Sequence, residues 1–195
     1  MRRRMVGLGL GVMLLALPAL SQDWGIGVSY GLANDVERQF RLDEFDPPDV
    51  TAWVDYRLED QVLLRGTFGS MKVDGDNAGR SFSVQPGMPP APLPDLRTRI
   101  DYATVGVSYE FWDGSYTSGL FGGIGGYKVN PDPAPPELAN FRDHHETVFG
   151  WHVGVDGDLR ILARLSLVGR ITFHKIRSET GRSLLNAGAG LLYRF

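Results

Sequence analysis

The end of the chain, from residue 185 to 195, alternates strictly between two chemically different faces. One face gathers the apolar residues Leu185, Ala187, Ala189, Leu191, Tyr193 and Phe195. The other carries Asn186, Gly188, Gly190, Leu192 and Arg194. A period of two is the periodicity of a β-strand, whose successive side chains point to opposite sides. This segment therefore predicts a strand with one apolar side and one side of mainly small and polar residues.

Seven further segments show such alternation, so eight strands are predicted. They are Trp24–Leu32, Val50–Leu58, Val62–Met71, Arg99–Phe111, Ser115–Tyr127, Thr147–Leu159 and Leu165–Ile176. Asp113-Gly114 is a strong signal for a two-residue hairpin turn. Such a turn sets Phe111 opposite Tyr116, and the same register sets Val107 opposite Leu120. Strands of about nine to thirteen residues are long enough to cross a bilayer, which takes roughly 9–11 tilted residues.

The connections between these segments alternate in length. Short links lie at Glu59–Gln61, Asp113–Gly114 and Arg160–Ala163. Longer ones cover Ala33–Asp49, Val73–Thr98, Lys128–Glu146 and Arg177–Ser183. In an antiparallel sheet this alternation puts every short link at one end and every long one at the other. That asymmetry is typical of transmembrane β-barrels, which have short periplasmic turns and long extracellular loops.

A soluble barrel of the lipocalin type would show the same alternation with its apolar face turned inward. Its water-facing exterior would be rich in Lys, Glu and Thr, whereas the polar face here consists of Gly, Ser, Thr and isolated charges. Aromatic residues also gather toward the strand ends, as in the interfacial girdles of membrane barrels. We therefore predict an all-β fold, an eight-stranded antiparallel up-and-down transmembrane β-barrel.

The N-terminus has the features of a signal peptide. Three arginines precede an apolar run, Val6–Leu20, and small residues lie just before Gln22. The run is short for a helix that must cross the hydrocarbon, which takes roughly 20 residues. We predict a signal peptide at 1–21 and one outer-membrane barrel domain at 22–195.

Composition excludes several functional classes. The chain contains no Cys, which excludes disulfides, thiolate metal sites and a catalytic thiol. Without the predicted signal peptide, 17 basic residues remain against 23 acidic ones. This negative balance argues against a nucleic-acid partner, which requires a basic patch.

Over 22–195 the chain resembles the small OmpA/OmpX-type outer-membrane β-barrels. The resemblance rests on the signal peptide, the hairpin formed by Gly150–Leu159 and Leu165–Arg170, and the end Gly188–Phe195. It implies a location in the bacterial outer membrane, with membrane lipid and lipopolysaccharide around the barrel. It also implies insertion by the barrel assembly machinery, whose signal in such proteins is the terminal aromatic strand. The matching residues here are Leu191, Tyr193 and Phe195.

The family implied by this resemblance contains structural, adhesive and resistance-associated barrels, together with a few lipid A-modifying enzymes. We expect a non-enzymatic structural or surface-interaction protein that presents its long loops, to which an extracellular ligand could bind, and that needs no cofactor. The alternatives are a lipid A-modifying hydrolase and a conduit for small apolar molecules.

A hydrolase would need a nucleophile beside a base, and His174 with Ser178 and Glu179 invites comparison with the His-x-Ser pair of lipid A deacylase barrels. Here the spacing is four, about 13 Å along a strand, which is beyond hydrogen-bond reach. No catalytic residue is therefore assigned, and His152 and His174 are interpreted as polar filling of the lumen. The run Asp143-His-His-Glu146 offers metal-ligand types, but consecutive residues of an extended chain point opposite ways, so no metal site is assigned.

Charged residues on the small-residue face predict a lumenal charge network. Counting back from the first short turn puts Asp55 opposite Arg65, both inward. Glu110 is expected at a similar height, and Asp156 diagonal to Arg170 across another short hairpin. Because eight strands leave an interior just wide enough for side chains to fill, these charges should pair in a plugged core.

Overall fold

The computed structural model describes residues 23–36, 48–75, 81–82, 91–92, 96–111, 115–131, 146–177 and 183–195. Its strands are β1 Trp24–Asp35, β2 Pro48–Glu59, β3 Val62–Gly75, β4 Ser81–Phe82, β5 Ala91–Pro92, β6 Leu96–Glu110, β7 Tyr116–Pro131, β8 Glu146–Arg160, β9 Leu165–Ile176 and β10 Ser183–Arg194. Across this part of the chain no helix is long and apolar enough to cross a membrane. The predicted signal peptide lies outside the described residues.

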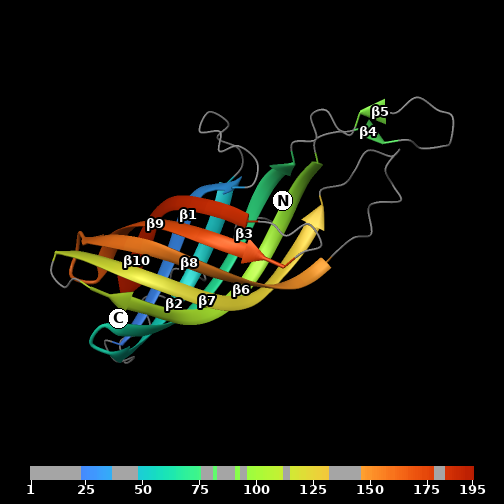
Figure 1. The fold of residues 1–195 in the computed structure, drawn as a ribbon. Helices are drawn as coiled ribbons and strands as arrows, with labels where there is room; N and C mark the ends of the chain where they lie inside the picture. The colour runs from blue at the N-terminus through green and yellow to red at the C-terminus, as the bar shows by residue number, and fades with distance from the viewer. Residues whose placement is uncertain are drawn as a thin grey trace, which may run out of the picture.

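Eight of these strands form a closed antiparallel barrel in the order β1-β10-β9-β8-β7-β6-β3-β2 (Figure 1). The predicted fold class is thereby confirmed. The β2–β3, β6–β7 and β8–β9 connections meet at one end, which we call the short-turn end, and the opposite end is the loop end. The two-residue strands β4 and β5 pair with each other in the connection between β3 and β6, where the sequence predicted no strand.

The first and the last strand of the barrel meet at the seam that closes it. β1 pairs with β10 from Gly25 opposite Arg194 to Asp35 opposite Leu184. Beyond the Gly25–Arg194 pair, the Phe195 N–H donates to the Trp24 carbonyl at 2.9 Å. The Phe195 side chain is buried, although alternation predicted it on the outward face.

The outward face of the barrel is apolar over a broad band. Its large exposed side chains include Val28, Phe68, Val105, Val107, Ile124, Phe149, Val155, Leu167 and Ile171. Soluble monomers rarely expose a continuous apolar surface of this size, whereas the hydrocarbon of a bilayer requires one. The inward residues of the same strands are mostly buried. The period-two pattern therefore separates a lipid-facing wall from a packed interior.

The register between β6 and β7 differs from the one predicted by the Asp113–Gly114 turn. Val107 lies opposite Gly122, not Leu120. The Phe111 N–H donates to the Ser118 carbonyl at 2.9 Å, so this connection is longer than a two-residue turn. The prediction was wrong by two residues, an even shift that leaves every side chain on its predicted face.

We predict that loss of Phe195 impairs assembly, because this residue continues the seam pairing and a barrel tolerates no open edge in lipid. Deleting Phe195 should reduce the heat-modifiable folded form in outer-membrane fractions, measured by electrophoresis without boiling. Phe111→Ala is the control, because it removes an exposed phenyl ring from the same end of the barrel. Normal assembly of the truncated chain would count against this role.

Candidate functional site

The barrel interior holds two buried arginines between two aromatic rings. Arg65 of β3 and Arg170 of β9 are each 5% exposed. The Cζ atom of Arg170 lies 4.5 Å from the ring centre of Trp53 and 4.6 Å from that of Phe121. The Cζ atom of Arg65 lies 4.9 Å from the Phe121 ring centre. Because water is largely excluded here, the attraction between guanidinium and aromatic face is stronger than at a surface.

Arg65 also bonds two carboxylates. Its Nε and Nη2 donate to Asp55 at 2.7 and 2.9 Å, and the β2–β3 register places these residues directly opposite each other. Its Nη1 donates to Asp156 of β8 at 2.5 Å. The Arg65 guanidinium is therefore paired with carboxylates from two sides of the barrel. An unpaired buried charge would lower the stability of the fold.

Asp156 lies directly opposite Arg170, so the predicted diagonal arrangement was wrong. The reason is the β8–β9 turn, in which the Ile161 N–H donates to the Leu165 carbonyl at 3.0 Å. Although it is opposite Arg170, Asp156 bonds Arg65 across the barrel. The Nε and Nη1 atoms of Arg170 have no hydrogen-bond partner within the described part of the chain.

The large interior rings lie opposite glycines. Trp53 is opposite Gly27, where an added Cβ would come within 2.1 Å of the indole ring. Phe121 is opposite Gly154, where a Cβ would come within 2.4 Å of the phenyl ring. The glycines of the polar face thus leave room for aromatic side chains. The sequence analysis did not single out Trp53, although alternation places it inward.

A second group of charges lies at the short-turn end. Arg194 Nη2 donates to Asp158 at 2.8 Å and to Glu110 at 3.3 Å, and Arg57 Nη2 donates to Glu110 at 3.1 Å. Glu110 therefore pairs with Arg57 and Arg194, not with Arg65. The sequence analysis did not select Arg57, Asp158 or Arg194, because it considered only charged residues that it expected at one height along the barrel axis.

The interior is apolar toward the loop end, which corrects the prediction of a lumen built of small and charged residues. A buried cluster there consists of Ala33, Met71, Val73, Ile100, Tyr102, Tyr127, Ile176 and Leu184. Its tyrosines meet polar partners: the Tyr102 hydroxyl lies 2.7 Å from Thr51 Oγ1, and the Tyr127 hydroxyl lies 3.1 Å from His174 Nδ1. Buried hydroxyl groups usually find such partners.

The histidines do not form a catalytic pair with a serine in the described residues. His152 and His174 lie inside the barrel, with ring centres 5.6 Å apart and exposures of 4% and 1%. Ser178 and Glu179 lie outside the described residues, as do the side chains of Asp143–Glu146. Where side chains are described, no group of three or more His, Asp or Glu residues is arranged to hold a metal ion.

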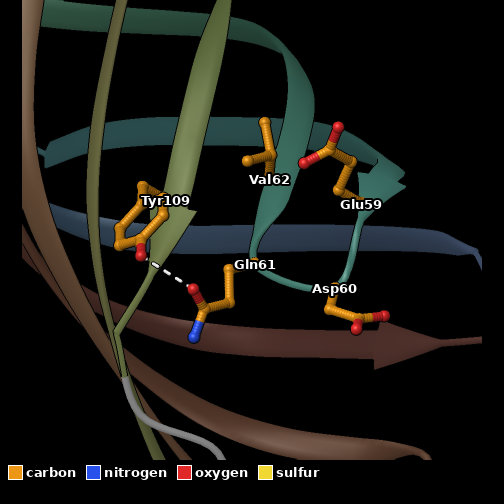
Figure 2. A pocket seen from close by; sticks show the side chains of 5 residues that line it. All are labelled: Glu59, Asp60, Gln61, Val62 and Tyr109. Atoms are coloured by element: carbon orange, nitrogen blue, oxygen red, sulfur yellow. Dashed lines mark hydrogen bonds between the residues drawn. The ribbon is translucent and has the colours of Figure 1, made fainter.

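An open hollow of about 570 Å³ lies at the β2–β3 turn (Figure 2). It is lined by Glu59, Asp60, Gln61, Val62 and Tyr109, and the Tyr109 hydroxyl donates to Gln61 Oε1 at 2.7 Å. Figure 2 shows the carboxylates of Glu59 and Asp60 on the side of the turn away from Tyr109. This lining offers no nucleophile beside a base, so the hollow gives no support to an enzymatic role.

Solved structures share this architecture. Neisserial surface protein A matches with a TM-score of 0.59 at 10% identity, over 90% of this chain and 98% of that one. Ail, the attachment invasion locus protein of Yersinia pestis, in complex with a heparin analogue, matches with a TM-score of 0.56 at 14% identity, over 89% and 98%. The N-terminal barrel domain of Pseudomonas aeruginosa OprF gives 0.53 at 10%, over 88% and 98%.

The chain has the fold of an eight-stranded outer-membrane β-barrel. The predicted resemblance to OmpA/OmpX-type barrels is thus confirmed at the level of the fold, which is all that likeness at such low identity establishes. No protein-family model matches the chain, and no curated protein matches its sequence.

The bonds of Arg65 predict a stability effect. Arg65→Ala leaves Asp55 and Asp156 without their guanidinium and should destabilise the barrel by about 3–5 kcal/mol. Asp55→Ala added to that variant should cost little more, because its partner is already gone. Urea unfolding of the refolded barrel in lipid bilayers measures all four corners of this double-mutant cycle. Strictly additive losses would show that the two side chains act independently.

The packed interior predicts a protein without steady ion conductance. Trp53, Phe121 and the arginines occupy the middle of the barrel, and an apolar cluster lies nearer the loop end. Single-channel recordings in planar bilayers should therefore show no stable open level. A reproducible conductance for the purified wild-type barrel would mean that water and ions pass these side chains.

Proposed function

We propose that the chain is a non-enzymatic outer-membrane β-barrel that presents its long connections outside the cell as a structural or surface-interaction element. The observation that carries this proposal is the contrast between a packed interior and connections of very different length at the two ends. The connections 36–47, 76–95 and 132–145 join strands at the loop end, whereas the connections 60–61, 111–115 and 161–164 at the short-turn end are short. Binding loops on a rigid scaffold are a common arrangement for recognition.

The two alternatives lack comparable support. A lipid-modifying hydrolase needs its base at the lipid-facing surface or the loop rim, whereas His152 and His174 are buried inside the barrel. A conduit for apolar molecules needs an open apolar path. The apolar cluster at the loop end would suit such a path, but all its members are buried, and Met71, Ile100 and Leu184 are each 0% exposed.

The surroundings of the barrel follow from the same proposal. The apolar outward band contacts membrane lipid, with lipopolysaccharide around the loop end in the outer leaflet. Residues 1–21 direct export and are removed. The barrel assembly machinery recognises the last strand through Leu191, Tyr193 and Phe195. The edge-to-face contact of Tyr193 with Phe195, at 5.2 Å between ring centres, supports this by holding the two aromatic residues together at the end of β10.

The known complex of Ail with the heparin analogue sucrose octasulfate suggests a ligand class to test. It is a property of Ail and says nothing directly of this chain. For this protein we propose sulfated glycans as the first probe of the long connections, since these are the surface that the proposed orientation exposes.

Orientation can be tested by labelling single cysteines, because the natural chain contains none. Val36→Cys lies at the loop end and Leu162→Cys in the β8–β9 turn, and both native side chains are exposed. A membrane-impermeant maleimide added to intact cells should label position 36 and spare position 162 until the outer membrane is opened. Asp60→Cys is a second short-turn position. Labelling of 60 or 162 from outside would reverse the topology and overturn the proposal.

A further inference from the structure

Three cations face outward on adjacent strands just beyond the apolar band. Lys72 of β3 lies directly opposite Arg99 of β6, and Lys128 of β7 lies opposite Asp101, the next outward residue of β6. Directly opposite residues have Cβ atoms about 5 Å apart and diagonal neighbours about 7–8 Å. Lys72, Arg99 and Lys128, which we call the cationic cluster, therefore lie within reach of a single phosphate-bearing headgroup.

Local hydrogen bonds orient the central member of this cluster. Arg99 Nε donates to Asp101 Oδ1 at 2.9 Å and to Ser70 Oγ at 3.1 Å. Both bonds use Nε, and the Arg99 side chain stays 53% exposed. Among the described side chains of this surface, three cations are set against one carboxylate, that of Asp101. The excess of positive charge therefore favours an anionic ligand.

On the side of the cationic cluster nearer the middle of the barrel, the outward surface is apolar. The outward row formed by Phe68, Ala103, Gly126 and Phe149 on β3, β6, β7 and β8 lies one outward residue below Lys128 and two below Lys72 and Arg99. Phe68 and Phe149 are 57% and 50% exposed, and a Cβ added to Gly126 would meet nothing within 4 Å. Ala103 and Gly126 thus form a low strip between two aromatic side chains, three strand spacings or roughly 14 Å apart.

We infer that this surface binds a phosphorylated, multiply acylated lipid of the leaflet at the loop end. The cationic cluster contacts the phosphate, and an acyl chain lies on the low strip between Phe68 and Phe149. Charge complementarity selects the headgroup, and the adjoining apolar strip selects a lipid over a free anion. This inference rests on the proposed function, because it places the loop end in the outer leaflet.

The test measures binding of lipid A, which carries phosphates and several acyl chains, to the folded barrel in detergent by native mass spectrometry. The variant K72Q/K128Q removes two cations of the cluster. The control R160Q/R164Q removes two exposed arginines at the short-turn end, so its change in net charge is the same. K72Q/K128Q should weaken binding roughly 10- to 30-fold, as expected for two surface cations near a lipid phosphate, and the control should leave it unchanged.

A third variant separates the acyl contact from the phosphate contact. Gly126→Leu fills the low strip at a position with open space, so it should fold normally while weakening lipid A binding severalfold. Equal losses in K72Q/K128Q and its control, no effect of Gly126→Leu, or equal occupancy by inorganic phosphate would each overturn the inference. Because binding in detergent does not depend on orientation, such a failure would leave the proposed function standing. Reversed cysteine labelling would instead remove the proposed function itself.

Discussion

Closure of the sheet is the constraint on which the rest of the structure depends. In hydrocarbon each backbone N–H or C=O group without a partner costs several kcal/mol, so a spanning sheet can have no free edge. β1 meets this requirement by pairing with β10 from Gly25 to Asp35. A closed sheet of eight strands encloses a narrow interior. Every inward side chain must therefore fit against strands that are not its neighbours, while every outward side chain meets lipid.

Because the interior is narrow, each inward side chain must both fit the available space and have its charge, if any, compensated. Trp53 and Phe121 fit because Gly27 and Gly154 lie opposite them. The guanidinium groups of Arg65 and Arg170 lie over the faces of these two rings. The aromatic side chains that fill the interior therefore also stabilise its cations. Toward the short-turn end the charges pair with one another, and toward the loop end apolar packing replaces them. The interior is thus layered along the barrel axis.

Much of this arrangement could be predicted from the sequence, because a strand's two faces follow from a local period of two. Counting back from the short β2–β3 turn predicted the Asp55–Arg65 pair correctly, and the irregular register between Arg57 and Glu59 is what keeps these two residues opposite each other. The register between β6 and β7 differs by two residues from the one that Asp113–Gly114 predicted. Contacts such as Arg65–Asp156 join strands that are not adjacent, so no local pattern contains them. The burial of Phe195 likewise depends on the closed seam.

The two carboxylates that accept hydrogen bonds from Arg65 lie at very different distances from it along the chain. Asp55 is 10 residues from Arg65 along the chain, whereas Asp156 is 91 residues away. Nearby residues meet early in folding because little chain entropy is lost, and distant ones meet late. The cation directly opposite Asp156 in the sheet is Arg170. In the closed barrel Asp156 nevertheless bonds Arg65, and Arg170 lies between its aromatic rings. The Arg65–Asp156 bond crosses the interior between strands that are not neighbours, so it forms only once the sheet has curled into a barrel.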